Sequence, residues 1–265
     1  MITAELQGKL GNMMFQIAFL ECAGHLYNLE TCYPHVNANI EALKKPQACT
    51  SEPHGEKYFT FFKNFDWHKN LGGNIRIDRT INVPFEYVPI EPIDYTRYIG
   101  YFQSEKYFPN RNFILNLFEP AEFIQDRLKK YKDIIGENKA SIHVRRGDYI
   151  KLNHIYNVLD MDYYTTAMKC LRMIGVDGYL VFSTDKEWCK ENFKGSQFTF
   201  IDDDSIVELF LMSKCDHHIA GNSAFSWWGC WLGDNPEKQV IAPKKWFTAK
   251  TPNGKDIIPE SWITI

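Results

Sequence analysis

The sequence lacks the long apolar runs of a membrane segment. No stretch in its 265 residues approaches about 18 uninterrupted apolar residues. The apolar run at residues 13–27 is interrupted by Gln16, Glu21 and His25, so it predicts neither a signal peptide nor a membrane anchor. We therefore expect no membrane span.

The chain also lacks a strong excess of charge and any paired cysteine motif. Its formal net charge of -3 argues against a general nucleic-acid binder, because no broad basic field is available to collect phosphates. The seven cysteines are widely spaced, which indicates reduced thiols rather than a disulfide framework or a zinc site. The histidines show no H-x-x-x-H spacing. We expect a cytoplasmic protein without a bound metal.

Several nucleotide and hydrolase motifs are missing too. No G-x-S-x-G elbow is present. The segment Gly8-x-x-Gly11-Asn12 lacks the third glycine of a dinucleotide fingerprint and the Lys-Ser/Thr of a P-loop. Two interpretations of this segment remain open: a tight strand–helix turn, or a close backbone approach to a ligand with Asn12 beside it.

Alternating apolar runs and helical patterns organise the rest of the chain. Residues 2–6 predict a strand, 13–27 an amphipathic helix, 44–76 loops and short elements, and 118–136 a helix at the junction of two domains. Further on, strands are predicted at 141–144, 179–183, 198–201, 217–220 and 240–242, and helices at 162–174, 186–193, 205–214 and 224–232. This alternation indicates an α/β fold built from βαβ units with a parallel sheet.

Polar, glycine-containing segments follow three of the predicted strands. They are residues 143–148, 183–185 and 221–223. Ligands of such sheets bind outside the carboxyl ends of the strands, so we expect the functional site there.

The adjacent Arg145 and Arg146 are the most informative pair at this edge. Packing does not explain two guanidiniums, because each carries five donors and a permanent charge. A diphosphate is the natural partner, since planar forks can hold phosphoryl oxygens and neutralise the charge of a leaving group. The alternative is a structural salt bridge between one of these arginines and Asp148.

The segment that starts at Asn222 predicts a capped, aromatic-rich helix. Asn222 or Ser223 can cap it, and its N-terminus also offers N–H groups to a phosphate; we favour a ligand role for both residues. We expect Trp227, Trp228 and Trp231 to serve packing.

Three segments together resemble glycosyltransferase family 11, the α-1,2-fucosyltransferases. The family's first glycine-rich motif is similar to residues 8–16, with Lys9 and Met13 departing from it. Its H-x-R-R-G-D-Y signature appears unbroken at 143–149, and its late N-S-T-F-S-W-W motif matches residues 222–228 with Ala224 in place of Thr. The signature is shared by a wider fucosyltransferase superfamily, and the late motif narrows the resemblance to α-1,2 transfer.

The resemblance implies a GT-B-like fold of two Rossmann-type domains with parallel sheets. Residues 1–136 would form the acceptor-side domain and residues 137–265 the GDP-fucose-binding domain. The implied bacterial-type enzyme inverts the anomeric centre as it moves L-fucose from GDP-β-L-fucose to the 2-hydroxyl of a galactose-terminated oligosaccharide. The resemblance implies no required metal or other cofactor.

It also implies roles for residues at matching positions. Arg145 would hold the β-phosphate, with Arg146 second. His143, Asp185 and Glu208 would serve the nucleoside, and Asn12, Asn222 and Ser223 would lie near the fucose and phosphates. Gly11, Phe225 and Ser226 complete the donor-binding candidates. We predict Asp148 as the catalytic base, with His154 and Asp162 as weaker candidates.

Three alternatives remain open. The run Asp202-Asp203-Asp204 has the D-x-D spacing with which some glycosyltransferases hold Mn²⁺ or Mg²⁺, but we favour a helix cap because Glu208 follows in the first turn. The reaction could instead be another fucosyl transfer, α-1,6 or to protein. A third interpretation is a sugar-nucleotide or glycan-binding module without turnover.

Overall fold

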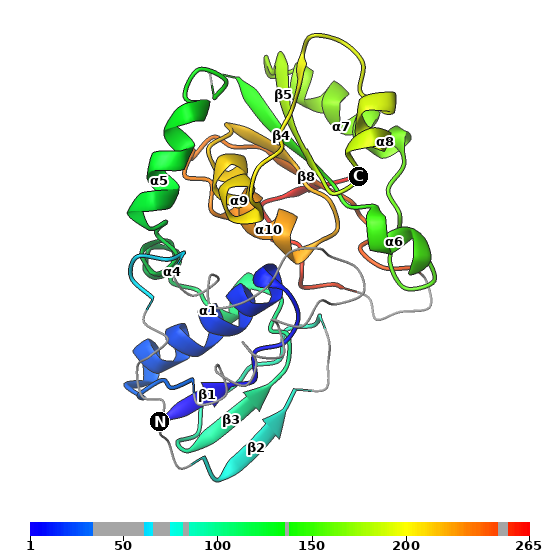
Figure 1. The fold of residues 1–265 in the computed structure, drawn as a ribbon. Coiled ribbons are helices and arrows are strands. Elements are labelled where there is room, and N and C mark those ends of the chain that lie inside the picture. The colour runs from blue at the N-terminus through cyan, green and yellow to red at the C-terminus, as the bar shows by residue number, and fades with distance from the viewer. Residues whose placement is uncertain (34–60, 66–74, 82–84, 136–137, 249–253) are drawn as a thin grey trace. The chain divides into compact units, whose positions relative to one another are not determined.

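The computed structural model describes residues 1–33, 61–65, 75–81, 85–135, 138–248 and 254–265 (Figure 1). They form two compact units: Met1–Glu122 with Gly254–Ile257, and Phe123–Asn253 with Ile258–Ile265. The predicted junction between residues 136 and 137 lies outside the described residues, as do Cys49 and most of the loops predicted at 44–76.

The first unit contains a small parallel sheet of order β1-β3-β2. Its strands and helices are β1 (Ile2–Ala4), α1 (Leu10–Tyr27), β2 (Ile77–Thr80), β3 (Thr96–Ile99), η1 (Glu105–Tyr107) and α4 (Arg111–Leu117). The prediction of an amphipathic first helix was wrong, because α1 carries apolar side chains around its whole circumference and is buried over most of its length. Its polar Gln16 is buried too, and its side chain donates to the Gly100 carbonyl at 3.0 Å.

The second unit contains a larger parallel sheet of order β6-β5-β4-β7-β8-β9. Its strands are β4 (Lys139–Val144), β5 (Gly178–Ser183), β6 (Phe198–Phe200), β7 (His217–Ile219), β8 (Val240–Ala242) and β9 (Ile263–Thr264). Its helices are α5 (Glu122–Leu128), whose first residue belongs to the first unit, η2 (Lys129–Tyr131), α6 (Gly147–Lys151), α7 (Met161–Arg172), α8 (Lys186–Asn192), α9 (Ser205–Ser213) and α10 (Ala224–Trp231). The predicted α/β fold with parallel sheets is confirmed.

The strand order of the second sheet reverses between β4 and β7. From β4 the chain moves outward through β5 to β6, and it then returns to β7 and continues to β8 on the other side. Right-handed crossovers therefore place α7 and α8 on one face of the sheet and α9 and α10 on the other. The carboxyl ends of β4 and β7 flank the topological switch point, where sheets of this kind bind ligands.

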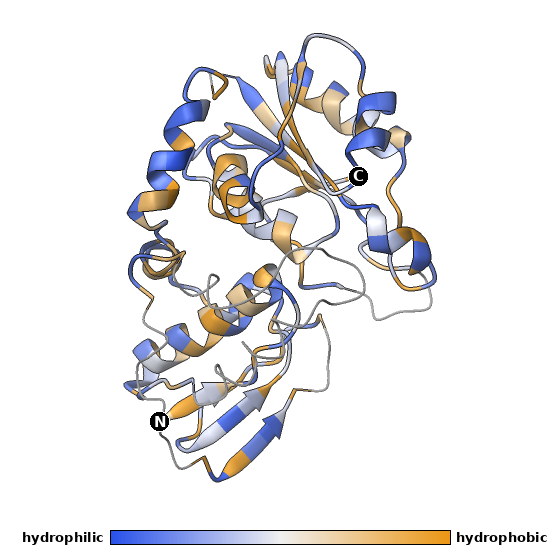
Figure 2. Ribbon diagram, viewed as in Figure 1, coloured by the Kyte–Doolittle hydropathy of each residue, from blue (hydrophilic) through white to orange (hydrophobic). Residues whose placement is uncertain are grey.

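Both faces of this sheet are covered by apolar side chains. Tyr164 and Leu171 of α7 pack on Ile142 and Val181 from one side. On the other side Trp227 and Trp228 are completely buried and Trp231 nearly so, which confirms their predicted packing role. Figure 2 shows the contrast between α9, mostly orange, and α8, mostly blue.

The prediction of one helix at 118–136 was wrong in its extent. The helical residues there are α5 and the short η2, so the helix begins later than predicted and its regular part is brief. Phe118 instead closes α4, and Pro120 forms a bridge with Phe62, which takes the chain out of helical conformation before Glu122.

Candidate functional site

The carboxyl end of β4 turns directly into α6 and carries the arginine pair. Val144 and Ser183 are register partners on β4 and β5, so Arg146 and Asp185 each lie two residues beyond paired positions. Gly147 has a φ of 23°, outside the range of ordinary L residues, and a Cβ there would lie 3.3 Å from Oγ1 of Thr184. The glycine thus lets the chain turn closely past the β5 end.

Arg145 and Asp148 form an ion pair within this turn. The Arg145 Nη2 atom lies 2.7 Å from Asp148 Oδ2, and both side chains are about four-fifths buried. The guanidinium also lies 5.3 Å from the centre of the Tyr149 ring. The salt bridge that the sequence left as an alternative is therefore present. It fixes Arg145 beside the predicted base, and Oδ1 of Asp148 is buried with no hydrogen-bond partner among the described residues.

Arg146 is held by a different pair of residues. Its Nε atom forms an ion pair with Asp185 Oδ2 at 3.5 Å, and its guanidinium carbon lies 4.2 Å from the centre of the Trp188 ring. The other carboxylate oxygen of Asp185 accepts from the Trp188 backbone N–H at 3.3 Å and caps α8. Asp185, predicted to serve the nucleoside, lies here against an arginine.

The end of β7 approaches β4 very closely. A Cβ on Gly221 would lie 2.8 Å from the His143 carbonyl oxygen and 3.0 Å from its Nδ1 atom. His143 is buried, and burial lowers the pKa of its imidazole to about 3, so the ring is neutral. Its Nδ1 has no hydrogen-bond partner among the described residues, and its ring lies 5.5 Å from that of Phe225.

Ser223 and Ser226 define the start of α10. The Ser223 hydroxyl accepts from the Ser226 N–H at 3.1 Å, so Ser223 is the helix cap, and the Ser226 hydroxyl accepts from the Gly221 N–H at 2.9 Å. Contact of these serines with a donor stays a prediction.

Asn222 joins two loops of the second unit. Its side-chain amide is fully buried and donates to the carbonyls of Asn157 at 2.7 Å and Trp246 at 2.8 Å. The same two loops meet again where the Thr248 N–H donates to the Ile155 carbonyl at 3.0 Å. Asn222 therefore has a structural role in holding these loops together, and its predicted contact with a ligand stays a prediction.

Glu208 lies in the first turn of α9. Its Oε1 atom accepts from the Asp203 N–H at 3.2 Å, and burial raises the pKa of its carboxyl to about 7. Buried carboxyls with a raised pKa are frequent in functional sites.

The three aspartates before α9 are ion-paired rather than used as caps. Asp204 occupies the N-cap position, but its side chain makes no cap hydrogen bond and pairs with Arg127. Asp202 pairs with Lys186, and Asp203 contacts Arg127, Lys130 and Tyr131. Although burial opposes it, hydrogen bonds from Lys130 and Tyr131 lower the pKa of Asp203 to about 2. The prediction of side-chain caps was therefore wrong for this run.

Metal ligands are not assembled in the part of the chain that the structure describes. No group of three or more His, Cys, Asp or Glu residues there is placed to hold an ion. Across the same residues, no helix combines the length and apolarity needed to cross a bilayer.

The remaining candidates belong to other elements. Gly11 and Asn12 belong to the first turn of α1 in the first unit, where Asn12 Oδ1 accepts from Gln103 Nε2 at 2.7 Å. His154 is exposed in the loop after α6. Asp162, in the first turn of α7, lines a cavity of about 410 Å³ between α7 and the segment after β8, and no predicted donor-binding residue lines that cavity. In the second unit, the carboxyl ends of β4, β5 and β7 and the start of α10 thus carry His143, Arg145, Arg146, Asp148, Asp185, Asn222, Ser223, Phe225 and Ser226.

Comparison with known proteins identifies the family. A family model described as "Glycosyl transferase family 11" matches residues 1–265. Because this match covers the whole chain, the protein is a glycosyltransferase, and it belongs to glycosyltransferase family 11.

Two proteins of Escherichia coli are among its relatives. The chain is 36% identical over 181 residues to the O-antigen biosynthesis glycosyltransferase WbnK, covering 63% of this chain and 59% of that protein. It is 34% identical over 181 residues to an alpha-1,2-colitosyltransferase, covering 63% of this chain and 62% of that protein. The matched parts thus span about three fifths of these relatives. A galactoside alpha-(1,2)-fucosyltransferase 2 of Oryctolagus cuniculus is 23% identical over 158 residues, covering 53% of this chain and 45% of that protein.

Solved structures share the fold at low identity. The fucosyltransferase NodZ from Bradyrhizobium aligns with a TM-score of 0.52 at 10% identity, covering 86% of this chain and 91% of that chain. POFUT1 in complex with GDP-fucose aligns with a TM-score of 0.54 at 12% identity, covering 91% of this chain and 97% of that chain. These neighbours have a GT-B-like fold, as the sequence predicted.

Proposed function

We propose that this chain transfers L-fucose from GDP-β-L-fucose to the 2-hydroxyl of a terminal galactoside with inversion, forming an α-1,2 linkage. The observation that carries the proposal is the pair Arg145 and Arg146, which follow the carboxyl end of β4 beside the topological switch point and are each held by a carboxylate. Family membership and an α-1,2-fucosyltransferase among the relatives support it.

Two fixed guanidiniums suit a nucleoside diphosphate leaving group. As the bond from fucose to the β-phosphate breaks, negative charge grows on the phosphate, and donors already in place stabilise that charge without reorganising. Both arginines are mostly buried, so their charges are less screened by water than surface charges are. Each has one carboxylate partner, which prevents an uncompensated buried charge before the donor binds.

Asp148 is the proposed base for the acceptor hydroxyl. Only one of its oxygens contacts Arg145, and the buried Oδ1 atom remains to accept a proton. The competing interpretation is that Asp148 only orients Arg145, in which case its loss would change donor affinity along with rate.

Arg145→Ala and Asp148→Asn separate these roles. Arg145→Ala should weaken GDP binding and slow turnover by about 2–4 kcal/mol, since the diphosphate is present in the donor and the transition state alike. Asparagine can still accept from Arg145, so Asp148→Asn should leave GDP affinity nearly unchanged and cut turnover by about 10²–10⁴. Calorimetric GDP titration and single-turnover kinetics measure the two effects.

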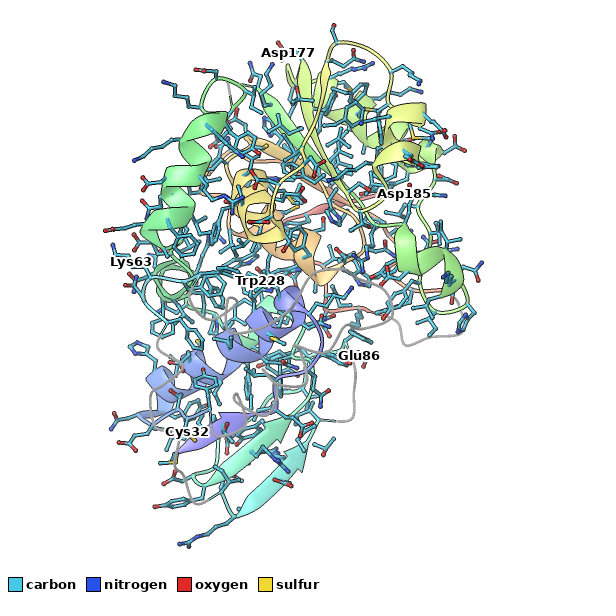
Figure 3. The ribbon with its side chains drawn as sticks, viewed as in Figure 1. Cys32, Lys63, Glu86, Asp177, Asp185 and Trp228 are labelled. Carbon is cyan, nitrogen blue, oxygen red and sulfur yellow. The ribbon has the colours of Figure 1, made fainter. Side chains whose placement is uncertain are left out.

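Asp177→Asn is the matched control. Asp177 is an exposed aspartate just before β5, whereas Asp185 follows the other end of that strand (Figure 3). It should change neither quantity. Near-normal turnover of Asp148→Asn would make Asp148 structural and move the search for the base to His154 or Asp162.

We also propose that no metal ion is required. The arginine pair and the α10 N-terminus would supply the positive charge that a cation supplies in metal-dependent transferases. Transfer should therefore persist in EDTA. Loss of activity in chelator with recovery on adding Mn²⁺ would refute this part of the proposal.

A second candidate donor is a colitosyl nucleotide, because one relative with 34% identity is an alpha-1,2-colitosyltransferase. Incubation with GDP-fucose and GDP-colitose, each with a panel of β-galactosides, decides between the donors. Linkage determination of the product also distinguishes α-1,2 transfer from α-1,6 or protein O-fucosylation. Binding of GDP-fucose without any transfer would instead indicate a non-catalytic module.

A further inference from the structure

Arg146 is held from two sides by one short segment, the start of α8. Asp185, the residue before this helix, forms an ion pair with the arginine Nε, and Trp188, in its first turn, lies under the guanidinium. The carboxylate also caps the helix through the Trp188 N–H. The two residues that hold Arg146 are therefore fixed to each other.

The carboxylate alone does not set the orientation of the guanidinium. The Nε–Oδ2 distance of 3.5 Å is an ion pair, but Nε is buried with no hydrogen-bond partner among the described residues. Charge attraction without a directed hydrogen bond leaves the planar group free to tilt. The Trp188 ring, 4.2 Å from the guanidinium carbon, supplies the missing constraint, because a cation is attracted to the face of an indole.

The ring is itself rigidly placed. Trp188 packs edge-on against Phe193, with ring centres 6.1 Å apart and planes at 82°, and lies 6.3 Å from the Tyr164 ring. Both of these neighbours are almost fully buried. Because Trp188 packs on core residues of the second unit, its ring has a fixed position and can orient the guanidinium of Arg146.

We propose that Trp188 is a positioning residue that holds Arg146 in the orientation needed to bind the donor diphosphate. The inference rests on the proposed function, since it acts through the predicted phosphate-binding arginine. Trp188 contributes through its aromatic face, so another aromatic residue should largely replace it and an aliphatic residue should not.

Three variants test this inference. Trp188→Leu should lower kcat/KM for GDP-fucose about tenfold or more, whereas Trp188→Phe should stay within about threefold of the parent. Phe198→Leu is the matched control, because the Phe198 ring packs against Phe193 and Tyr179 in the same cluster rather than against Trp188 or Arg146. It should lower the melting temperature and leave kcat/KM unchanged.

The double variant Arg146→Ala/Trp188→Leu shows whether the effect passes through the arginine. If it does, the double variant should be no slower than Arg146→Ala alone. Additive losses would overturn the inference, as would an equal loss of kcat/KM in Phe198→Leu.

GDP titration of the same proteins keeps this test separate from the transfer reaction. Trp188→Leu and Arg146→Ala should weaken GDP binding by similar factors, and Phe198→Leu should not weaken it. If the parent transfers no fucose, the proposed function fails, and the titration still decides the positioning role. Unchanged GDP affinity in Trp188→Leu, beside a clear loss in Arg146→Ala, would refute it.

Discussion

The buried carboxyl of Glu208 makes a specific prediction about stability and pH. Burial raises its pKa from the usual 4.5 to about 7, so the folded protein binds this proton more tightly than the unfolded chain does. Stability is then undiminished below pH 4.5, falls as pH rises from 4.5 to 7, and stays lowered above 7. The gap between the two pKa values corresponds to about 3 kcal/mol, and partial exposure reduces this to about 2–3 kcal/mol.

Glu208→Gln should remove this cost. Glutamine keeps an oxygen that can accept from the Asp203 N–H, so the 3.2 Å hydrogen bond survives while the buried charge disappears. The variant should match the parent near pH 4.5 and melt about 5–10 °C higher at pH 8. Thermal unfolding of both proteins at several pH values measures the difference.

The control for this experiment is Glu191→Gln. Glu191 is exposed on α8, so its substitution should shift stability by less than about 0.5 kcal/mol at either pH. If Glu208→Gln is no more stable than the parent at pH 8, the carboxyl is either solvated or stabilised in its ionised form, and the burial argument is wrong.

Two further substitutions test the close packing at the switch point. Gly221→Ala would bring a methyl group within 2.8 Å of the His143 carbonyl, and it should cost about 1–3 kcal/mol in denaturant unfolding as β4 and β7 separate. Asn222→Ala removes both amide hydrogen bonds and leaves the Asn157 and Trp246 carbonyls unpaired; it should cost about 2–4 kcal/mol and speed hydrogen exchange in both loops. Normal exchange in those loops would show that Asn222 does not hold them.

The βαβ half of the chain was predictable because its local signals agree. The strand at Val240–Ala242 was predicted to the residue, and α9 within one residue of its end, since apolar runs and helix starts are well separated there. The strand β2 gave no such signal. It is a mostly exposed edge strand, Ile77–Thr80, so no buried face imposes an apolar alternation on its sequence.

Within the site, only contacts between residues close together in the sequence were predictable. The Arg145–Asp148 pair spans one helical turn and was foreseen as an alternative. The contact of Arg146 with Trp188 was missed, because it depends on the pairing of Val144 with Ser183 between two strands. The capping prediction for Asp204 failed for a similar reason: its partner Arg127 lies far away in sequence, on α5.

The loop that contains Asn157 and the loop that contains Trp246, both bonded to Asn222, form one structural unit. Tyr156 and Phe247 pair across them as a β-bridge, and Asn157 donates to the Lys245 carbonyl at 3.2 Å. A chimera that takes only the segment after α6 from a relative would lose these contacts between the two loops. An exchange of either loop between family members should therefore move both loops together and keep Asn222, which bonds to both.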